Sequence, residues 1–317
     1  MNFIDFHCDT AYRMIEEGKH ITDSILKANL NNIKAGNAMA QFFAMFIEKD
    51  QVDDSFEYCN KMLLNFKNEI SKHEDILELC RNFDDLKRAK EAGKIGAFLT
   101  IEEGDALKGK LDNLRHFKDE GISLVTLTWN FENALGYPNV AFINKDKGLK
   151  EKGIAVVEEM NRLGMLIDVS HLSDAGFFDV ARYSKMPFIA SHSNARVMTN
   201  HSRNLTDEMI KILANKGGVT GINFCNAFLN KNPNPSDDEV ATIENMIRHI
   251  KHIRNVGGIE VIGIGSDFDG IGNEVEIKNS SEMGKLAFAL EKEGFVESEI
   301  EKIFYGNALR IIKDVLK

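Results

Sequence analysis

Eight short runs of apolar and β-favouring residues recur along this 317-residue chain, separated by stretches with helical periodicity. Each run is too short for an ordinary helix, so we predict strands. Eight strands that alternate with helices are what a closed (β/α)8 barrel of the TIM type requires. The predicted strands are a run ending at His7 and residues 38–46, 96–101, 122–128, 165–169, 188–190, 219–224 and 261–265.

The composition favours one large α/β domain over residues 1–317. The chain is 43% hydrophobic, which is ample for a large buried core, and neither a linker nor a shift in composition divides it. A doubly wound open sheet is the alternative architecture. It is disfavoured because no glycine-rich phosphate-binding loop follows any of the predicted strands.

Charge and cysteine usage narrow the partners and the compartment. The net charge is −10 and no continuous basic stripe occurs, which argues against a nucleic-acid partner. No apolar segment approaches membrane-spanning length, and the first predicted strand leaves no room for a signal peptide, so we expect no membrane association. The cysteines are scattered without zinc-knuckle spacing, as expected in the reducing cytoplasm: Cys8, Cys59, Cys80 and Cys225. The sequence leaves a homodimer open.

Polar residues of metal-ligand type follow several of the predicted strands. In a (β/α)8 barrel the carboxyl ends of the strands surround one mouth, where active sites lie. Taken singly, a histidine at a strand end is typically an ordinary hydrogen-bonding residue, and an aspartate before glycine a turn former. Together on one face they predict a metal site for zinc or a similar ion. They are His7, Asp9, Glu103, His171, His192 and Asp267.

Sequence motifs around these residues resemble those of the renal (membrane) dipeptidases, a zinc-dependent branch related to the amidohydrolases. The resemblance runs from Phe3 to about Arg310. It rests on Phe-His-Cys-Asp-Thr at 6–10, Glu-Gly at 103–104, Asp-Val-Ser-His at 168–171, Ser-His-Ser at 191–193, Ser-Arg-Asn at 202–204 and Gly-Ile-Gly-Ser-Asp-Phe-Asp-Gly at 263–270. It implies a (β/α)8 metallo-dipeptidase.

The resemblance also implies two Zn²⁺ ions per chain. The implied ligands are His7 and Asp9 for one ion, His171 and His192 for the other, and Glu103 as the bridge. Two such ions roughly 3.5–4 Å apart can share a water, lower its pKa and polarise the scissile carbonyl. Glu102 competes with Glu103, since alternation lets only one of them face the metals. Periodicity does not decide between them, and Glu103 is chosen from the resemblance.

Two further roles follow from the resemblance. Asp267 is expected to handle protons, and it is preferred to Asp269 because it lies closer to its strand. Arg203 is expected to bind the substrate carboxylate through its planar fork of donors, and it is preferred to Arg196 because it lies in the Ser-Arg-Asn motif.

One departure concerns the fourth predicted strand, after which relatives of the renal enzyme carry a histidine that helps hold the substrate carbonyl. This chain has Trp129 there. An indole donates a hydrogen bond but is not a cation, so we expect Asn130 or a zinc ion to stabilise the oxyanion. Trp129 and Asn130 are both predicted to contact substrate.

The predicted function is therefore a cytoplasmic zinc dipeptidase that hydrolyses small dipeptides with a metal-bridging hydroxide. One alternative is an amidohydrolase acting on an N-acyl amino acid, a lactone or a phosphoester. Arg203 argues against a neutral ester, because such a substrate has no carboxylate for the arginine to bind. A second alternative is a metal-binding scaffold without turnover. The loop 226–239 follows the seventh predicted strand, and we expect it to cover part of the site.

Overall fold

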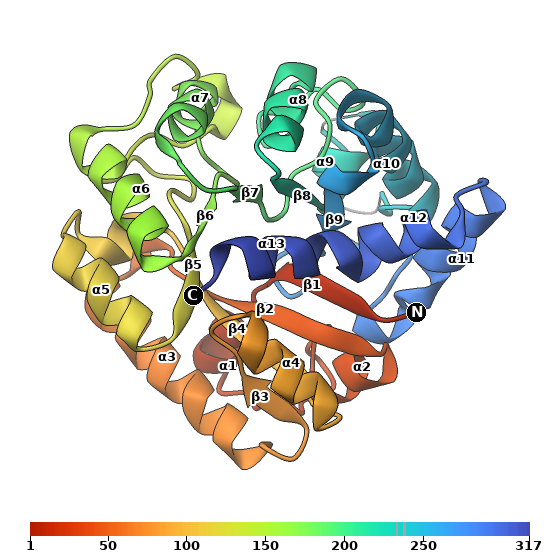
Figure 1. Ribbon diagram of the computed structural model, residues 1–317, viewed down its shortest axis with the longest axis horizontal. Helices are drawn as coiled ribbons and strands as arrows, with labels where there is room; N and C mark the ends of the chain where they lie inside the picture. The colour runs from red at the N-terminus through yellow and green to blue at the C-terminus, as the bar shows by residue number, and fades with distance from the viewer. Residues whose placement is uncertain (233, 237–238) are drawn as a thin grey trace.

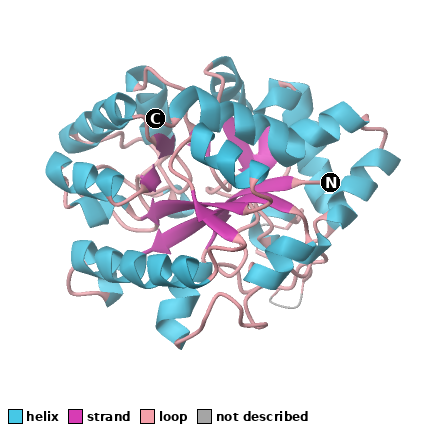
Figure 2. Cartoon of the chain, turned by 60° about the horizontal axis from the view of Figure 1, so that its bottom comes forward, coloured by secondary structure: helices cyan, strands magenta, loops and turns pink. Residues whose placement is uncertain are grey.

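Eight parallel strands close into a barrel, and helices surround it (Figures 1 and 2). The structure is a computed structural model that describes residues 1–232, 234–236 and 239–317. Pairing between β2 and β4 closes the barrel, and all eight predicted strands are confirmed. The barrel strands are β1 (Phe3–Cys8), β2 (Ala38–Phe46), β4 (Ile95–Glu102), β5 (Ile122–Thr126), β6 (Leu166–Asp168), β7 (Ile189–Ala190), β8 (Val219–Ile222) and β9 (Ile262–Ile264).

A further strand, β3 (Leu77–Leu79), was not predicted. It pairs in parallel with the first residues of β4, outside the closed ring. Three residues with one central charge carry too little of the two-residue periodicity to be recognised from sequence.

The helices follow the strands round the barrel (Figure 1). A π-helical turn, Lys302–Gly306, joins the last two. The helices are α1 (Thr10–Glu17), α2 (Leu30–Ala35), α3 (Ser55–Lys72), α4 (Phe83–Glu91), α5 (Leu111–Asp119), α6 (Glu151–Leu163), α7 (Asp174–Tyr183), α8 (Asp207–Asn215), α9 (Asn226–Leu229), α10 (Ile243–Gly257), α11 (Gly284–Lys292), α12 (Glu297–Glu301) and α13 (Asn307–Val315).

Local sequence signals set the helix ends. Asp54 begins α3, where its carboxylate accepts hydrogen bonds from the backbone N–H groups of Phe56 and Glu57. Gly164 ends α6 with φ 66°, a left-handed conformation that costs glycine little. The chain then turns directly into β6.

The interior of the barrel is apolar at its amino-terminal end. Phe42 stacks on Phe98 with ring centroids 4.6 Å apart, and Phe6 packs against Phe42. The apolar face of α13, including Ile311 and Ile312, belongs to the same buried cluster and lies across this end of the barrel (Figure 1). The interior is therefore sealed on this side, and polar side chains gather at the carboxyl ends of the strands.

Candidate metal and active site

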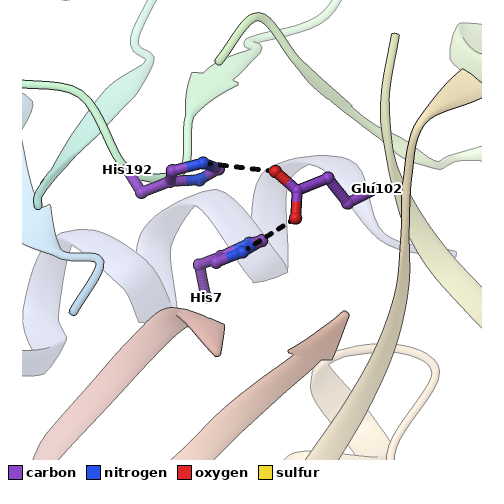
Figure 3. Close-up of side chains that lie close together, drawn as sticks. All are labelled: His7, Glu102 and His192. Carbon is purple, nitrogen blue, oxygen red and sulfur yellow. Dashed lines mark ion pairs between the residues drawn. The ribbon is translucent and has the colours of Figure 1, made fainter. Parts of the chain in front are cut away.

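Side chains from three separate strands meet at the carboxyl end of the barrel. His7 lies on β1, Glu102 ends β4 and His192 follows β7 (Figure 3). One carboxylate oxygen of Glu102, Oε2, lies 3.1 Å from His7 Nε2, and the other, Oε1, lies 3.4 Å from His192 Nε2. All three side chains are buried. Residues that are far apart in sequence thus form one compact group of metal-ligand type.

An irregularity in β1 directs His7 into this group. Ile4 and Phe6 point into the barrel, yet Cys8 belongs to the outer core, so strict alternation is broken between them. The pairing with β2 shifts register between Asp5 and Cys8, as a bulge would cause. The imidazole of His7 consequently reaches the mouth, where its Nε2 lies 3.3 Å from Oδ2 of Asp9.

Glu102, and not Glu103, faces the histidines, which corrects the prediction. Alternation along β4 places Phe98 inside the barrel, and Glu102 lies four residues later on the same face. Leu99 and Ile101 occupy the opposite, helix-facing side. Both faces of a parallel strand are buried, which is why periodicity alone did not choose between the two glutamates. The polar Thr100 on the inward face was the available signal.

Glu103 instead holds the loop that follows β5. Its carboxylate accepts hydrogen bonds from the backbone N–H of Trp129, at 2.9 Å, and from the side-chain amide of Asn133. It also accepts one from the backbone N–H of Asp105. Burial raises the pKa of Glu103 to about 7. Its contacts tie the β4 and β5 loops together and fix the backbone of Trp129 at the edge of the site.

His171 and His192 complete the histidine group. Nε2 of His171 lies 3.1 Å from Oε1 of Glu102 and 3.1 Å from Nε2 of His192. The other ring nitrogen of His171, Nδ1, lies 3.2 Å from Oδ1 of Asn130. Asn130 was predicted to contact substrate, and in the structure its side-chain oxygen contacts and orients His171. Trp129 lines the cavity beside these residues, and its ring packs edge-on against Phe46.

Asp267 lies beside the group, on the loop after β9. Its Oδ1 is 3.8 Å from His7 Nε2, and its Oδ2 accepts a 2.9 Å hydrogen bond from the side-chain amide of Asn223. Its backbone has φ 62°, in the left-handed region that costs a non-glycine residue of order 1 kcal/mol or more. Asn223 was not singled out from sequence, although it directly follows β8. Burial raises the pKa of Asp267.

Arg203 is buried behind His192. Its Nη2 donates a 3.2 Å hydrogen bond to the carbonyl of His192, and its guanidinium lies over the ring of Phe228. Within the described part of the chain it makes no ion pair, and its Nε has no hydrogen-bond partner. Arg196, the alternative considered from sequence, is instead held by Asp174 through two hydrogen bonds of 2.6 and 2.7 Å.

Burial and neighbouring charges shift the pKa values of the group. Burial opposes ionisation of Glu102, but the charge of His7 and the close approach of the His171 and His192 rings hold its pKa well below the ordinary value. Burial lowers the pKa of His171 to about 3, so its imidazole is neutral. Burial raises the pKa of Asp9 to about 8, as expected where buried carboxylates crowd together. A divalent cation would offset this concentration of negative charge.

Two orphaned atoms support the same reading. Among the described residues, Nε2 of His7 lies within 3.3 Å of carboxylate oxygens of Glu102 and Asp9 but forms no hydrogen bond of suitable geometry, and Oδ1 of Asp9 is buried without a hydrogen-bond partner. Buried polar atoms without a partner are rare and costly in folded proteins. Potential ligand atoms of His7, Glu102 and His192, and of His7, Asp9 and Asp267, lie within 4.8 Å of one another. The donor set of imidazole nitrogens and carboxylate oxygens fits zinc or a similar ion.

A cavity of about 400 Å³ opens onto four residues of this group, Asp9, Glu102, His171 and Asp267. Its wall includes the neighbouring rings of Tyr12, Phe46 and Trp129, together with Phe228 from α9. Residues 233 and 237–238 of the loop expected to cover the site lie outside the described residues. The volume falls in the range typical of small-molecule sites, about 300–1,000 Å³.

Comparison with known proteins identifies the family. The sequence profile of the membrane dipeptidases, peptidase family M19, matches residues 1–317. The chain belongs to this family. A dipeptidase of Schizosaccharomyces pombe, not yet characterized, is 32% identical over 310 residues, covering 90% of this chain and 71% of the yeast protein. An uncharacterized Klebsiella pneumoniae protein from the pqqA 5' region is 32% identical over 243 residues, 75% of this chain and 89% of that protein.

Solved structures agree with this assignment. A family M19 metallopeptidase described as dipeptidase AC has a TM-score of 0.92 and 25% identity, covering 100% of this chain and 99% of that one. A Rhodobacter sphaeroides metallopeptidase, bound to a phosphinate mimic of the dipeptide L-Ala-D-Ala, shares the fold, with a TM-score of 0.91, 24% identity and 99% coverage of both chains.

This member of the family is thus a metallo-dipeptidase with a (β/α)8 barrel fold. Despite the family's name, no helix among the described residues is long and apolar enough to cross a membrane.

A glycine beside the two aspartates provides the first prediction. A Cβ at Gly270 would lie 2.0 Å from Oδ2 of Asp9 and 2.7 Å from Oδ1 of Asp267. We expect Gly270→Ala to displace both carboxylates and to lower kcat/KM about tenfold or more, which corresponds to about 1.4 kcal/mol. Gly272 lines the same cavity, yet a Cβ there would have nothing within 4 Å.

Gly272→Ala is therefore the matched control, and it should keep near-normal kcat/KM and metal content. Both quantities are measured on purified proteins by steady-state kinetics and elemental analysis. Equal losses in the two variants would show that the crowding at Gly270 is not what matters.

Proposed function

We propose that this chain is a two-metal dipeptidase that acts, as one catalytic domain, on small dipeptides with a free carboxyl terminus. The observation that carries the proposal is the position of Glu102. One of its oxygens faces His7, while the other faces His171 and His192. A carboxylate placed between two sets of metal-ligand side chains is suited to bridge two cations. The potential ligands also outnumber the four positions of a single tetrahedral ion.

In this proposal zinc is the metal. His7 and Asp9 would hold one ion, His171 and His192 the other, and Glu102 both. Ions bound there would supply Lewis acidity toward the scissile carbonyl and lower the pKa of water. The orphaned nitrogen of His7 supports this ligand set.

Asp267 is proposed to carry the proton during hydrolysis. It lies at the mouth beside His7 while its Oδ2 is held by Asn223, so one oxygen is fixed and the other faces the cluster. A carboxyl group in that position can accept a proton during attack and return it to the leaving amine. Its orientation depends on the amide of Asn223, whose own oxygen accepts a hydrogen bond from the backbone of Cys225.

Arg203 is proposed to bind the carboxylate of the substrate. A buried guanidinium that makes no ion pair within the described residues has charge available for a ligand. Phe228, whose ring lies against the guanidinium, lines the cavity, so Arg203 lies directly behind this part of the cavity wall. Recognition of a free carboxylate at one end would favour dipeptides over neutral esters and lactones.

The deciding experiment is a hydrolysis screen on the zinc-loaded enzyme. The panel should contain dipeptides with L- and D-residues, including L-Ala-D-Ala, together with matched tripeptides, dipeptide amides and N-acyl amino acids. We expect turnover of dipeptides and at least tenfold lower kcat/KM for the amides, which lack the carboxylate. Preferential turnover of acyl amino acids, or none of any substrate by metal-loaded protein, would contradict the proposal.

We place the enzyme in the cytoplasm. The four cysteines are free thiols, and three of them are buried. Free thiols of this kind are typical of a reducing compartment.

Arg203→Lys tests the carboxylate clamp. Replacing a planar fork by a point charge should raise KM for dipeptides about tenfold while kcat changes little. Arg196→Lys is the control, since Arg196 binds Asp174 and serves the scaffold. It should lower thermal stability without a selective effect on KM. An unchanged KM for Arg203→Lys, measured by initial rates, would remove the clamp from the proposal.

A further inference from the structure

Asp168 is a buried carboxylate at the end of β6 that the proposed mechanism does not use. Its side chain is fully buried and accepts four hydrogen bonds. Oδ1 accepts from the backbone N–H groups of Ser170, at 2.9 Å, and Ser191, at 2.8 Å. Oδ2 accepts from the hydroxyls of Thr126, at 2.7 Å, and Ser191, at 2.6 Å. Each oxygen is thus occupied by two donors.

A second short contact continues from Ser191 to His192. Oγ of Ser191 lies 2.7 Å from Nδ1 of the adjacent imidazole. The other ring nitrogen, Nε2, lies 3.4 Å from Oε1 of Glu102 (Figure 3). A continuous chain of short contacts therefore runs from Asp168 through one hydroxyl to the ring that points at the centre of the site.

We propose that Asp168 and Ser191 are positioning residues that fix the tautomer of His192. The carboxylate can only accept, so the single hydroxyl proton of Ser191 is donated to Asp168. The oxygen of Ser191 must then accept from Nδ1–H of His192. The lone pair is left on Nε2, the nitrogen that faces Glu102, which is the form in which an imidazole binds a metal ion. This inference rests on the proposed role of His192 as a ligand.

Burial of the three residues fixes the direction of these hydrogen bonds. Asp168, Ser191 and His192 are all nearly or fully buried, so water does not compete for their donors. The backbone of His192 is held as well, since its N–H donates to Oγ of Ser170 and its carbonyl accepts from Arg203. The ring is thus anchored at the backbone and at Nδ1, which sets the direction of Nε2.

The variant Asp168→Asn gives the most specific test. The two backbone N–H donors at Oδ1 would retain the amide oxygen, which forces the NH₂ group toward the hydroxyls of Thr126 and Ser191. Ser191 would then accept from the amide and donate its proton to Nδ1 of His192. The direction of this relay, the hydrogen-bond chain from Asp168 through Ser191 to His192, is thereby reversed. Nε2 of His192 then carries the hydrogen and cannot bind a metal ion. Ser191→Ala only removes the relay and leaves the tautomer unbiased.

The barrel contains a matched control. Asp5 on β1 is also fully buried and accepts a 2.6 Å hydrogen bond from the hydroxyl of Ser266 and a 2.9 Å bond from its backbone N–H. Among the described residues, this pair contacts the backbone N–H and carbonyl of His7 but no imidazole nitrogen. Ser266→Ala and Asp5→Asn therefore reproduce the loss of a buried carboxylate–serine pair without acting on a ring nitrogen.

The measurement is zinc affinity of the full-length enzyme, by competition with a chromophoric chelator, together with NMR of ring ¹⁵N-labelled histidine. We expect a hydrogen-bonded Nδ1–H signal from His192 that moves in Ser191→Ala, and a loss of zinc affinity of about 10- to 100-fold in that variant. Asp168→Asn should lose more zinc affinity than Ser191→Ala. Asp5→Asn and Ser266→Ala should both lower thermal stability, but they should not differ from each other in zinc affinity in this way.

Three outcomes would overturn the inference: an unmoved Nδ1–H signal in Ser191→Ala, equal zinc affinities in the Asp168 and Asp5 variants, or a smaller effect of Asp168→Asn than of Ser191→Ala. Should Asp168→Asn fail to fold, the NMR signal and affinity of Ser191→Ala still decide. A moved signal with unchanged zinc affinity would instead show that His192 is not a ligand, a failure of the proposed function and not of the relay.

Discussion

Glu102→Gln should abolish dipeptide hydrolysis and remove more than one metal ion per chain. An amide offers one neutral oxygen in place of two charged ones, and Glu102 faces His7 with one oxygen and His171 with the other. Loss of the bridging carboxylate would weaken both proposed sites at once. The expected fall in kcat/KM is about a thousandfold or more, equivalent to about 4 kcal/mol. Elemental analysis and steady-state kinetics on the same preparation provide the measurement.

Glu103→Gln is the matched control, because the two residues are adjacent and both are buried. Glu103 accepts its hydrogen bonds from Trp129, Asn133 and Asp105, so the amide would turn an NH₂ toward at least one buried donor. An unsatisfied buried donor costs about 1–3 kcal/mol of stability. We expect a lower melting temperature with nearly full metal content. Metal loss in Glu103→Gln but not in Glu102→Gln would reinstate the assignment made from sequence.

The fold was predictable from sequence because parallel barrel strands are buried on both faces. Such strands read as short continuous apolar runs, and residues 38–46 are the clearest example. β3 escaped recognition because its pattern is three residues long. The contribution of α13 was also out of reach, because sequence shows an amphipathic helix but not which end of the barrel its apolar face covers.

Site residues could be predicted where it was enough to know that they follow a strand. They could not be predicted where a shift of one residue along the strand changes the face on which a side chain lies. His7, Asp9, His171, His192 and Asp267 do meet at one mouth. Choosing between Glu102 and Glu103 required knowing which face of β4 points inward.

Long-range hydrogen bonds were also invisible to sequence patterns. Asn223 holds Asp267 across a separation of 44 residues, and Ser191 reaches Asp168 across 23. Asparagine, serine and threonine at strand ends are ordinary turn formers, so nothing in the chain distinguishes those that hold a functional group.

Asp267→Asn should lower kcat by about a hundredfold to ten-thousandfold while metal content stays close to that of the wild type. The amide keeps the size of the side chain but cannot accept and release a proton. Asp267 lies 3.8 Å from Nε2 of His7, farther than Glu102 at 3.1 Å or Asp9 at 3.3 Å, which argues for a reactive group beside the cluster instead of a ligand within it.

Asp269→Asn separates this role from a structural one two residues away. Asp269 accepts hydrogen bonds from the hydroxyl of Thr10, at 2.6 Å, and from the backbone of Lys27, at 2.7 Å, and so ties the segment before α2 to the barrel. Its amide variant should lose stability and keep kcat. Initial rates, elemental analysis and thermal melts on both variants make the comparison. If Asp267→Asn loses metal in proportion to activity, Asp267 is a ligand, and the proton must be carried by another group at the mouth of the barrel.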